Sequence, residues 1–421
     1  MKFDDNSLYC VSTNHEGTRR SLYDLATWKN GLSFKKIDFS ETGLPVIKIA
    51  ELNNGISAST AFTQGTYSEE LFLTKGDIVF SWSGNPQTSI DVFRYNLPDG
   101  WLNQHIFKVT ANEYYVSKDY LYYVLKYLKP HFTQIATNKQ TTGLGHVTIA
   151  DIKRMSVVVP SHEVQSTIVD VLKPIDDKIQ LNNEINDNLQ QQAQALFKKW
   201  FIDNPDAALW QEGTFSDLIE KTISGDWGKD KPSGNNTEMV YCIRGADIPE
   251  VRAGNKGKMP IRYILPKNFA SKQLVNGDIV VEISGGSPTQ STGRAAAISS
   301  SLLARYDKGM VCTNFCKALK PITGYSMYVY HYWQYLYDRG VFFSYENGTT
   351  GIKNLDISGF IETEPIFIAP AELVKKFDTF CQSVFSKVYA NGLESEQLAL
   401  VRDTLLPKLM SGEIDVNDIR L

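Results

Sequence analysis

The chain has 421 residues, more than one compact core ordinarily holds, so two or more domains are expected. Its balance of 42% hydrophobic and 21% charged residues is typical of folded globular proteins and excludes a disordered chain. A net charge of −4 neither requires nor excludes a nucleic-acid partner, because it averages over surfaces that face different partners.

The chain shows no sign of a membrane or secretory protein. It contains no run of about 18 apolar residues, and its first residues lack the basic and apolar segments of a signal peptide. Its five cysteines are odd in number and mostly far apart, which indicates reduced thiols. We therefore expect a cytoplasmic protein without a membrane partner.

Residues 20–160 alternate short apolar runs with turn residues. The runs at 77–82, 105–109 and 155–160 are rich in Val, Ile and Phe, and predict β-strands. Residues 119–128, DYLYYVLKYL, predict a helix with an aromatic face. The mixture indicates an α+β domain with an irregular, loop-rich sheet.

A helical stripe follows this first domain. Apolar residues from Val164 to Trp200 recur at steps of three and four, which is typical of a helix that packs along one face. Pro174 lies inside the stripe, and we expect the long helix to start or kink there. The apolar positions expected to hold the helix to its neighbour include Ile175, Ile179, Ile185 and Leu189.

The second half of the chain repeats the first. KGDIVFSWSG at 75–84 matches NGDIVVEISG at 276–285, so that Gly277 follows Gly76 by 201 residues. Three further blocks match at shifts of 196, 208 and 210 residues: Val46 with Cys242, Thr141 with Thr349, and Pro160 with Pro370. Order is kept and the shift grows steadily, as it would if loops had lengthened in one copy. The sequence predicts two copies of one structural unit.

The second copy also ends in an apolar stripe, which includes Val384, Val388, Leu398 and Val401. Asn391–Gly392 interrupts this stripe, and we expect a bend there. Each helix either packs on its own domain or pairs with the other helix. Two observations favour pairing: the stripes are longer than the sheet domains need, and a duplicated chain supplies two matching helices.

No catalytic signature is evident in the sequence. A phosphate-binding loop of the form G-x-x-x-x-G-K-[ST] is absent, and the Gly-rich run at 284–294 lacks the required lysine. Cys312 and Cys316 have no second Cys/His pair nearby, and the six histidines form no close pair that suggests a metal site. We therefore expect a binding protein without a cofactor or metal of its own.

Several segments resemble one known family. ALFKKWFID at 195–203, LLPKLMSGEIDV at 405–416, and the repeated GDIV and TTG blocks are similar to segments of the type I restriction–modification DNA specificity subunits. The resemblance covers essentially the whole chain.

The resemblance implies two loop-rich target-recognition domains, residues 1–160 and 204–370, in a pseudo-twofold internal repeat. Residues 161–203 and 371–421 would form a long antiparallel two-helix coiled-coil spacer between them. Each domain would read one half of a bipartite, asymmetric site on double-stranded DNA. Two methyltransferase (modification) subunits would dock on the helices, and a restriction (translocase and nuclease) subunit would join them. S-adenosylmethionine, ATP and Mg²⁺ would act in those partners.

Base reading requires polar side chains on loops that reach the groove edges, and phosphate contacts require cations. The stretches 81–89 and 138–146 offer such side chains in the first domain, and 284–294 and 346–354 offer them in the second. The DNA-binding candidates are Ser83, Asn85, Gln87, Lys139, Gln140 and Thr142, and then Ser287, Gln290, Arg294, Asn347, Thr350 and Lys353. Among them, Arg294 is the residue best suited to guanine.

Three other functions stay open at this point. The first is a specificity protein of a related system, such as one that serves a fused or type IIB-like nuclease. The second is an enzyme whose active site is unrecognised. A coiled-coil adaptor that binds only proteins is the third alternative. The polar loops that follow GDIV in both copies favour DNA reading over the adaptor.

Overall fold

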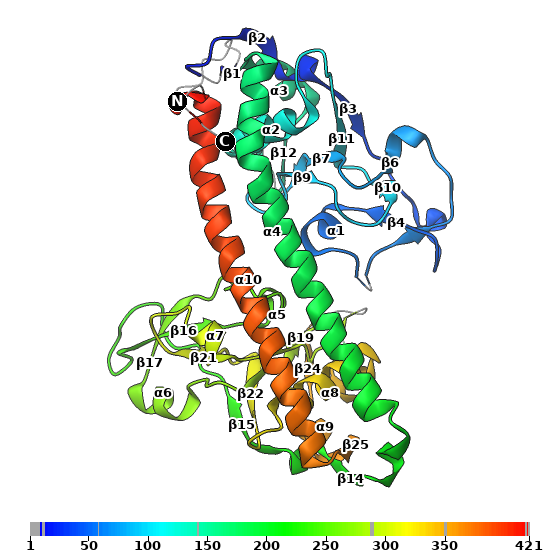
Figure 1. The fold of residues 1–421 in the computed structure, drawn as a ribbon, viewed down its shortest axis with the longest axis vertical. Helices are drawn as coiled ribbons and strands as arrows, with labels where there is room; N and C mark the ends of the chain where they lie inside the picture. The colour runs from blue at the N-terminus through cyan, green and yellow to red at the C-terminus, as the bar shows by residue number, and fades with distance from the viewer. Residues whose placement is uncertain are drawn as a thin grey trace. The chain divides into compact units, whose positions relative to one another are not determined.

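The computed structural model describes residues 9–10, 13–57, 59–140, 143–286, 290–348, 352–416 and 419 (Figure 1). The chain divides into two compact units, one formed by residues 1–177 and 399–421 and the other by residues 178–398. Both units mix helices and strands, as the sequence predicts for an α+β fold. None of the helices in the described part of the chain combines the length and hydropathy that a membrane span needs.

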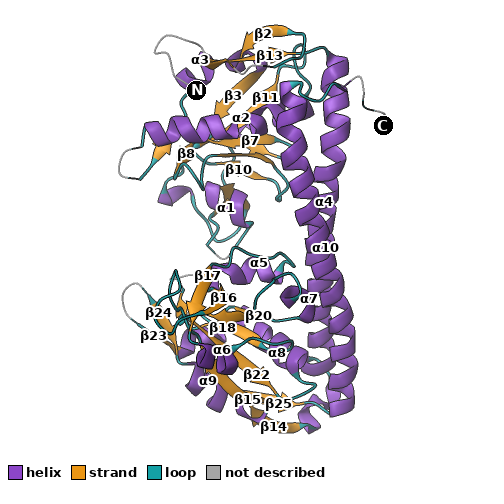
Figure 2. Cartoon of the chain, turned by 90° about the vertical axis from the view of Figure 1, so that its left-hand side faces the viewer, coloured by secondary structure: helices purple, strands orange, loops and turns teal. Residues whose placement is uncertain are grey.

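The first unit is built on a four-stranded antiparallel sheet of order β3-β11-β7-β9. Its strands are Ala26–Asn30, Ile106–Ala111, Ile78–Ser81 and Asp91–Arg94. Helix α2 (Lys118–Asn138) lies along this sheet (Figure 2). It buries the aromatic and aliphatic face that the sequence predicts. The strands predicted at 77–82, 105–109 and 155–160 and the helix predicted at 119–128 are confirmed.

Two smaller sheets complete the first unit. One has the order β5-β4-β10-β6 (Phe62–Thr63, Leu44–Ile47, Gly100–Leu102, Phe72–Leu73), with β4 and β10 parallel. The other has the order β1-β13-β2 (Tyr9–Cys10, Met155–Val159, Thr18–Ser21). Short helices α1 (Ile49–Asn54) and α3 (Ile149–Arg154) follow β4 and precede β13.

The second unit repeats this plan. Its four-stranded antiparallel sheet has the order β15-β22-β18-β20 (Ile219–Ser224, Cys316–Pro321, Ile279–Glu282, Ala295–Ala297), and α8 (Ser326–Asp338) packs beside it. A second sheet, β17-β16-β21 (Ile261–Ile264, Glu238–Ile243, Met310–Cys312), again contains a parallel pair. The remaining elements are α5 (Ile248–Arg252), α6 (Pro266–Lys272), α7 (Ser300–Leu303), α9 (Ile357–Thr363), β14 (Gln211–Thr214) and β25 (Pro365–Ile368). The internal repeat is therefore a duplication of the fold.

The repeated GDIV block has the same structural role in both units. Its glycine, Gly76 or Gly277, adopts a left-handed φ of 94° or 92°, which favours glycine. The following aspartate accepts a hydrogen bond from the backbone N–H three residues before it and pairs with a lysine of the neighbouring strand. The two aspartate–lysine pairs are Asp77–Lys108 and Asp278–Lys320, at 2.9 Å each. The motif thus fixes a turn and anchors the next strand.

Helix α4 spans His162–Phe197, so the predicted helix start at Pro174 is wrong. The helix begins twelve residues earlier because Ser161 supplies the first acceptors. Its Oγ accepts from the N–H of Val164, and its carbonyl accepts from the N–H of Gln165. Pro174 lies inside the helix with its ring exposed to solvent.

Helix α10 spans Ala371–Ser411 without a break, so Asn391–Gly392, where the sequence predicts a bend, does not end the helix. A Cβ at Gly392 would lie only 2.0 Å from the carbonyl oxygen of Gly254. The glycine is explained by this close approach of the helix to the loop after α5, and not by a helix end.

Helices α4 and α10 contact each other within each unit. In the first unit, Arg402 of α10 pairs with Asp176 of α4 at 2.8 Å. In the second unit, Asn391 donates to Asn186 at 2.9 Å, and Asn182 donates to Glu394 at 2.9 Å. Among the predicted stripe residues, Val384 and Val388 are buried and Val401 is 47% exposed, while Ile175, Ile179, Ile185, Leu189 and Leu398 are partly buried.

Candidate nucleic-acid interface

In the first unit, two polar loops that are distant in sequence meet at a short antiparallel ribbon. Strand β8 (Ser83–Gly84) pairs with β12 (Gly145–His146), with Gly84 opposite Gly145 and Ser83 opposite His146. We call β8 and β12 with their flanking residues 85–89 and 139–140 the first ribbon. It brings together the two stretches from which the DNA-binding candidates of the first domain were chosen.

The position of the first ribbon is fixed by backbone contacts. The N–H of Trp82 donates to the carbonyl of His105 at 3.0 Å, and the N–H of Val147 donates to the carbonyl of Trp82 at 2.8 Å. Gly145 lies against helix α2, where a Cβ would come within 2.1 Å of the Ala136 carbonyl oxygen. Only glycine permits this approach, so the ribbon sits directly on α2.

The loop after β8 is ordered by Asn85. Its Oδ1 accepts from the N–H of Gln87 at 2.9 Å, and its carbonyl accepts from the N–H groups of Thr88 and Ser89. The side chains of Asn85 and Gln87 are exposed, whereas Ser83 is partly buried. This is a self-supported turn that presents polar groups to the outside.

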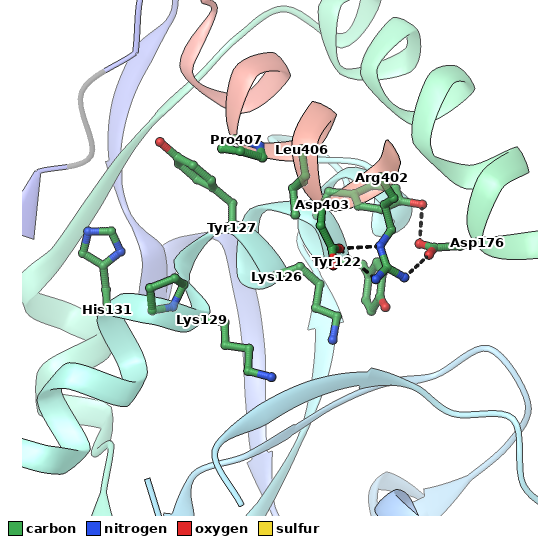
Figure 3. A pocket seen from close by; sticks show the side chains of 12 residues that line it. Tyr122, Lys126, Tyr127, Lys129, His131, Asp176, Arg402, Asp403, Leu406 and Pro407 are labelled. Carbon is green, nitrogen blue, oxygen red and sulfur yellow. Dashed lines mark hydrogen bonds and ion pairs between the residues drawn. The ribbon is translucent and has the colours of Figure 1, made fainter. Parts of the chain in front are cut away.

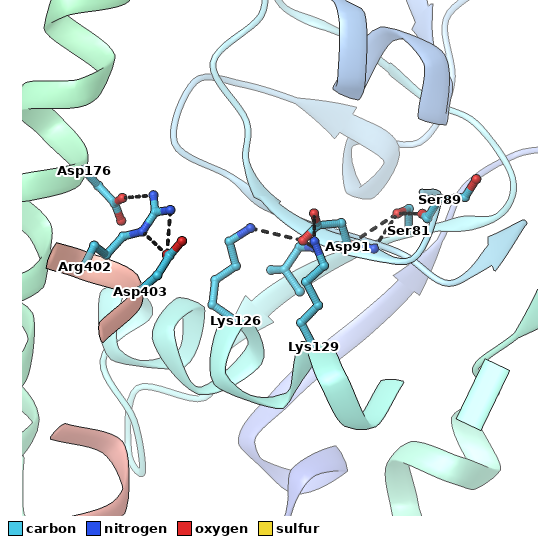
Figure 4. Close-up of polar contacts among 9 residues, drawn as sticks. Ser81, Ser89, Asp91, Lys126, Lys129, Asp176, Arg402 and Asp403 are labelled. Carbon is cyan, nitrogen blue, oxygen red and sulfur yellow. Dashed lines mark hydrogen bonds and ion pairs between the residues drawn. The ribbon is translucent and has the colours of Figure 1, made fainter. Parts of the chain in front are cut away.

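Asp91, which follows this loop in β9, connects the loop to helix α2 (Figure 4). The Ser81 hydroxyl donates to the Ser89 carbonyl, and the N–H of Asp91 donates to the Ser81 oxygen at 3.1 Å. Lys126 and Lys129 of α2 pair with the Asp91 carboxylate at 3.1 and 2.5 Å. Burial raises the pKa of Asp91, but the two lysines outweigh it and hold the pKa below its usual value. Asp91 stays ionised and leaves a surplus positive charge beside the loop.

A groove of about 440 Å³ lies beside these lysines in the first unit (Figure 3). Helices α2, α4 and α10 form its walls, and Lys126, Tyr127, Pro130, Arg402 and Leu406 are among its lining residues. Arg402 bridges Asp176 and Asp403, at 2.8 Å to each. The groove therefore combines apolar walls with ion pairs.

Lys139 is committed to an ion pair, which the sequence did not reveal. Its Nζ lies 2.6 Å from both carboxylate oxygens of Asp151, which is nearly inaccessible to solvent. Although burial raises the pKa of Asp151, hydrogen bonds from Lys139 and Thr148 lower it below its usual value. Lys139 therefore has a structural role in the fold.

The second unit has a matching ribbon. Strand β24 (Lys353–Leu355) pairs with β19 (Ser284–Gly285) on one side and β23 (Glu346–Asn347) on the other. We call these three strands with residues 290–294 the second ribbon. Its pairing again unites the two stretches from which the candidates were chosen.

Two cations of the second ribbon are held by buried carboxylates. Arg294 makes a bidentate ion pair with Glu282, at 2.8 Å from Nε and 2.7 Å from Nη2. Lys353 pairs with Glu346 at 2.7 Å, and Glu346 also accepts from the N–H and hydroxyl of Thr292. The hydrogen bonds to Glu282 raise the pKa of Arg294. The guanidinium group of Arg294, which the sequence suggests as a guanine-binding group, thus already binds the carboxylate of Glu282.

Besides Asn85 and Gln87, three further candidates are exposed, and three others cannot be placed. Gln140, Gln290 and Asn347 have exposed side chains at the edges of the two ribbons. Thr142, Ser287 and Thr350 lie outside the residues that the structure describes.

Sequence reasoning missed the acidic partners Asp151, Glu282 and Glu346. Their lysines and arginines lie seven to twelve residues away along the chain, and only hairpin and helix-cap geometry brings them together. It also missed two exposed aromatic side chains next to the second ribbon, Trp227 and Phe315. An isolated aromatic residue in a loop carries no sequence signal that distinguishes it from a core residue.

The ribbons present hydroxyl, amide and backbone groups, which can bind the edges of bases or phosphates. Among the described residues, no group of three or more His, Cys, Asp or Glu side chains could hold a metal ion. Cys242, Cys312, Cys316 and Cys381 are buried free thiols. Burial raises the pKa of the Cys242 and Cys316 thiols to about 12, so neither is a ready nucleophile.

The chain is similar to DNA specificity proteins of type I restriction–modification systems. Residues 15–191 match the family described as the type I restriction modification DNA specificity domain. The specificity subunit of the type I restriction enzyme HindI from Haemophilus influenzae is 25% identical over 406 residues, covering 81% of this chain and 87% of that protein. The MjaIX specificity subunit from Methanocaldococcus jannaschii is 27% identical over 332 residues, covering 72% and 71%.

A solved structure has a similar fold. The crystal structure of the type I restriction–modification S subunit from M. genitalium superposes with a TM-score of 0.51 and is 16% identical. The match covers 95% of this chain and 99% of that one, so the likeness in fold extends over both copies of the repeat.

Proposed function

Because residues 15–191 match the type I restriction modification DNA specificity domain and two specificity subunits are similar over most of the chain, we propose that this chain is a specificity subunit and that each of its units reads one half of a bipartite DNA target. The first ribbon would face one half-site and the second ribbon the other. The bases would be read in duplex DNA by side chains of the loops that flank each ribbon.

One observation carries this proposal. In both units a pair of distant polar loops is joined into a ribbon at the same place in the same fold. The framework is duplicated, but the side chains on it are not: Ser83, Asn85 and Gln87 stand on one ribbon, and Gln290, Asn347 and Lys353 on the other. Equal frameworks with unequal side chains fit a target whose two halves differ.

We assign the helices to a spacer and to partner binding. Under this proposal, residues 1–160 and 204–370 are the recognition domains, and the stretches 161–203 and 371–421 supply an antiparallel coiled coil. The contacts between α4 and α10 support mutual pairing. Two modification subunits would dock on these helices, where Leu181, Leu393 and Leu400 are exposed apolar side chains.

We also assign the chemistry to those partners. Methyl transfer from S-adenosylmethionine and ATP- and Mg²⁺-dependent cleavage would belong to the modification and restriction subunits, in the cytoplasm. The chain itself would bind double-stranded DNA without a cofactor. Purified alone, it should neither methylate nor cut DNA, and activity without partners would contradict this assignment.

The test is methylation-aware sequencing of the host DNA with and without the gene for this chain. We expect one two-part motif to lose its methylation in the deletion strain. A second strain would carry the triple substitution Ser83→Ala, Asn85→Ala and Gln87→Ala in the first ribbon. That strain should change or relax one half of the motif and keep the other, whereas changes in both halves would contradict separate reading.

A further inference from the structure

A cavity of about 450 Å³ opens beside the second ribbon. Its lining includes the aromatic side chains of Trp227 and Phe315 and the polar side chains of Arg244, Glu282, Ser284 and Asn314. Ser284 belongs to β19, so the cavity borders the ribbon directly. We call it the aromatic cavity.

The two aromatic side chains are unusually exposed. Trp227 is 38% and Phe315 is 62% accessible to solvent, although both are large enough to stabilise a core if buried. Exposed aromatic rings that gather around a cavity mark a binding surface more often than a chance feature.

The indole of Trp227 is held on one face by Arg262. The guanidinium of Arg262 lies 4.0 Å from the centroid of the indole ring, and its Nε donates to the Trp227 carbonyl at 2.7 Å. Arg262 is itself only 6% exposed and also pairs with Asp230. One face of the indole is therefore fixed by a buried cation, which makes it a rigid platform.

Phe315 is held by its backbone next to the ribbon. Its N–H donates to the Thr313 hydroxyl at 3.3 Å, and its carbonyl accepts from the N–H of Ile283 at 2.9 Å. Ile283 immediately precedes Ser284 of β19. Phe315 thus lies next to the start of β19, and its ring is exposed to solvent.

The polar groups of the cavity are preorganised by ion pairs. Arg244 is fixed by Asp247 at 2.8 Å, and Glu282 by Arg294 at 2.7 Å. A planar ligand between aromatic walls would meet hydrogen-bonding groups only at its edge. Aromatic faces combined with edge contacts are how proteins hold unstacked nucleobases.

We propose that the aromatic cavity receives one nucleobase of the half-site read by the second unit, unstacked from its neighbours. This inference rests on the proposed function and adds a specificity site to it. Trp227 and Phe315 stack on the base, and the polar groups contact its edge. Stacking of this kind tolerates any base, so the choice of base comes from the edge contacts.

The first unit differs at the corresponding place. Trp82 donates its N–H to the carbonyl of His105, as Ile283 does to that of Phe315, so His105 is the counterpart of Phe315. The His105 ring lies against Trp82, with 5.2 Å between the ring centroids. The proposal therefore concerns only the half-site that the second unit reads.

The test uses the full chain in the complex that copurifies with it and a duplex that carries the target motif. 2-Aminopurine, whose fluorescence rises when it leaves the base stack, replaces each base of the half-site in turn. We expect fluorescence to rise severalfold at one position on binding. The double variant Trp227→Ala and Phe315→Ala should abolish this rise and weaken binding by about tenfold or more.

Two control variants separate stacking from damage to the fold. Trp227→Phe keeps an aromatic face and should retain most of the signal. Tyr114→Ala removes an aromatic side chain of the first unit that is 81% exposed, and it should change neither signal nor affinity. Unchanged circular dichroism and melting temperature in the double variant would show that its loss of binding is local.

The outcomes distinguish this inference from the proposed function. If the wild-type complex does not bind the motif, the proposed function fails and the inference falls with it. If the complex binds but 2-aminopurine stays quenched at every position, the inference alone is overturned. A double variant that binds as tightly as wild type overturns it as well.

Discussion

Lys139 lies in the loop before β12 and pairs with Asp151, and Lys353 lies in β24 and pairs with Glu346. Each of these two carboxylate side chains is only 5% exposed. The sequence predicts that removing either charge weakens DNA binding and reduces its dependence on salt. Their ion pairs add a structural requirement, because an unpaired buried carboxylate is unfavourable. The same side chain can therefore affect stability and DNA binding, and both need to be measured.

We expect Lys139→Met to lower the free energy of unfolding by about 1–3 kcal/mol, because Asp151 would lose its partner. Urea titration at neutral pH measures this change. Gln140→Ala is the matched control, since Gln140 is the adjacent exposed residue. Equal stability of the Lys139 variant and the control would show that the ion pair contributes nothing.

His331 predicts a pH dependence of stability. It is buried between Gln194 at 2.8 Å and the Cys381 thiol at 3.6 Å. Burial, aided by Arg252, lowers its pKa to about 3. Below the unfolded value of about 6.5, the unfolded chain binds a proton that the folded chain does not. Stability is therefore fully present above pH 6.5 and falls as the pH decreases towards 3, by about 1.4 kcal/mol per pH unit.

Urea titrations at pH 7, 6 and 5 check this expectation. The difference in free energy of unfolding between wild type and His331→Gln should shift in favour of the variant as the pH falls. A difference that stays constant would mean that His331 titrates alike in both states. An NMR titration of the imidazole in the wild type gives an independent reading of its protonation.

At the scale of single elements, the contact between α4 and α10 in the second unit contains a polar layer. Asn186 is buried, and its Nδ2 donates to the carbonyls of Val388 and Ala253 at 3.0 and 3.1 Å. Its Oδ1 accepts from Asn391. A buried asparagine between paired helices allows only the register in which its hydrogen bonds form.

We expect Asn186→Ala to destabilise the second unit by about 1–3 kcal/mol, because it leaves the buried Asn391 amide without its acceptor. Asn183→Ala is the matched control, an exposed asparagine of the same helix. Thermal unfolding of the two variants checks the difference. If both melt at the same temperature, the polar layer does not stabilise the helix pair.

For replacement of Gly392 by alanine, we expect a change in stability opposite to the one that helix propensity predicts. Replacing an internal helical glycine with alanine should stabilise a helix by about 1 kcal/mol. Here the added Cβ would meet the Gly254 backbone at 2.0 Å, so we expect Gly392→Ala to destabilise the protein. Ala390→Gly, at an exposed position of α10, measures propensity alone. A stabilised Gly392→Ala would contradict the close approach.

The elements show what could be read from the sequence. Strands such as 77–82 and the helix at 119–128 follow from local apolar patterns, and the repeat follows from matched blocks. Pro174 does not start its helix, because the helix is capped by Ser161 and begins twelve residues earlier, and the glycine at 392 is explained by a contact with Gly254, which is distant in sequence. The ion pairs of Arg294 and Lys353 depend on tertiary geometry, which no local pattern encodes.

At the scale of the whole molecule, the first unit is assembled from both ends of the chain. Its core contains Leu409, Met410 and Val416 beside residues of α2 and β13. The second unit is built from the continuous stretch 178–398. The two units therefore depend differently on the last residues of the chain.

We expect removal of residues 399–421 to destabilise the first unit and spare the sheet core of the second. Hydrogen exchange followed by mass spectrometry checks this by comparing peptides of β7 and β11 with peptides of β18 and β22. Faster exchange should be confined to β7 and β11. Equal loss of protection in both sheets would contradict the division into units.

The start of the described chain lies against the end of its last helix. The hydroxyl of Thr13, the N–H of Asn14 and the ring of His15 contact the carbonyls of Met410, Ser411 and Leu409, at 3.1, 2.7 and 2.6 Å. Because Thr13 and Met410 lie 397 residues apart in sequence, these contacts form only when the last turn of α10 has folded against the rest of the first unit.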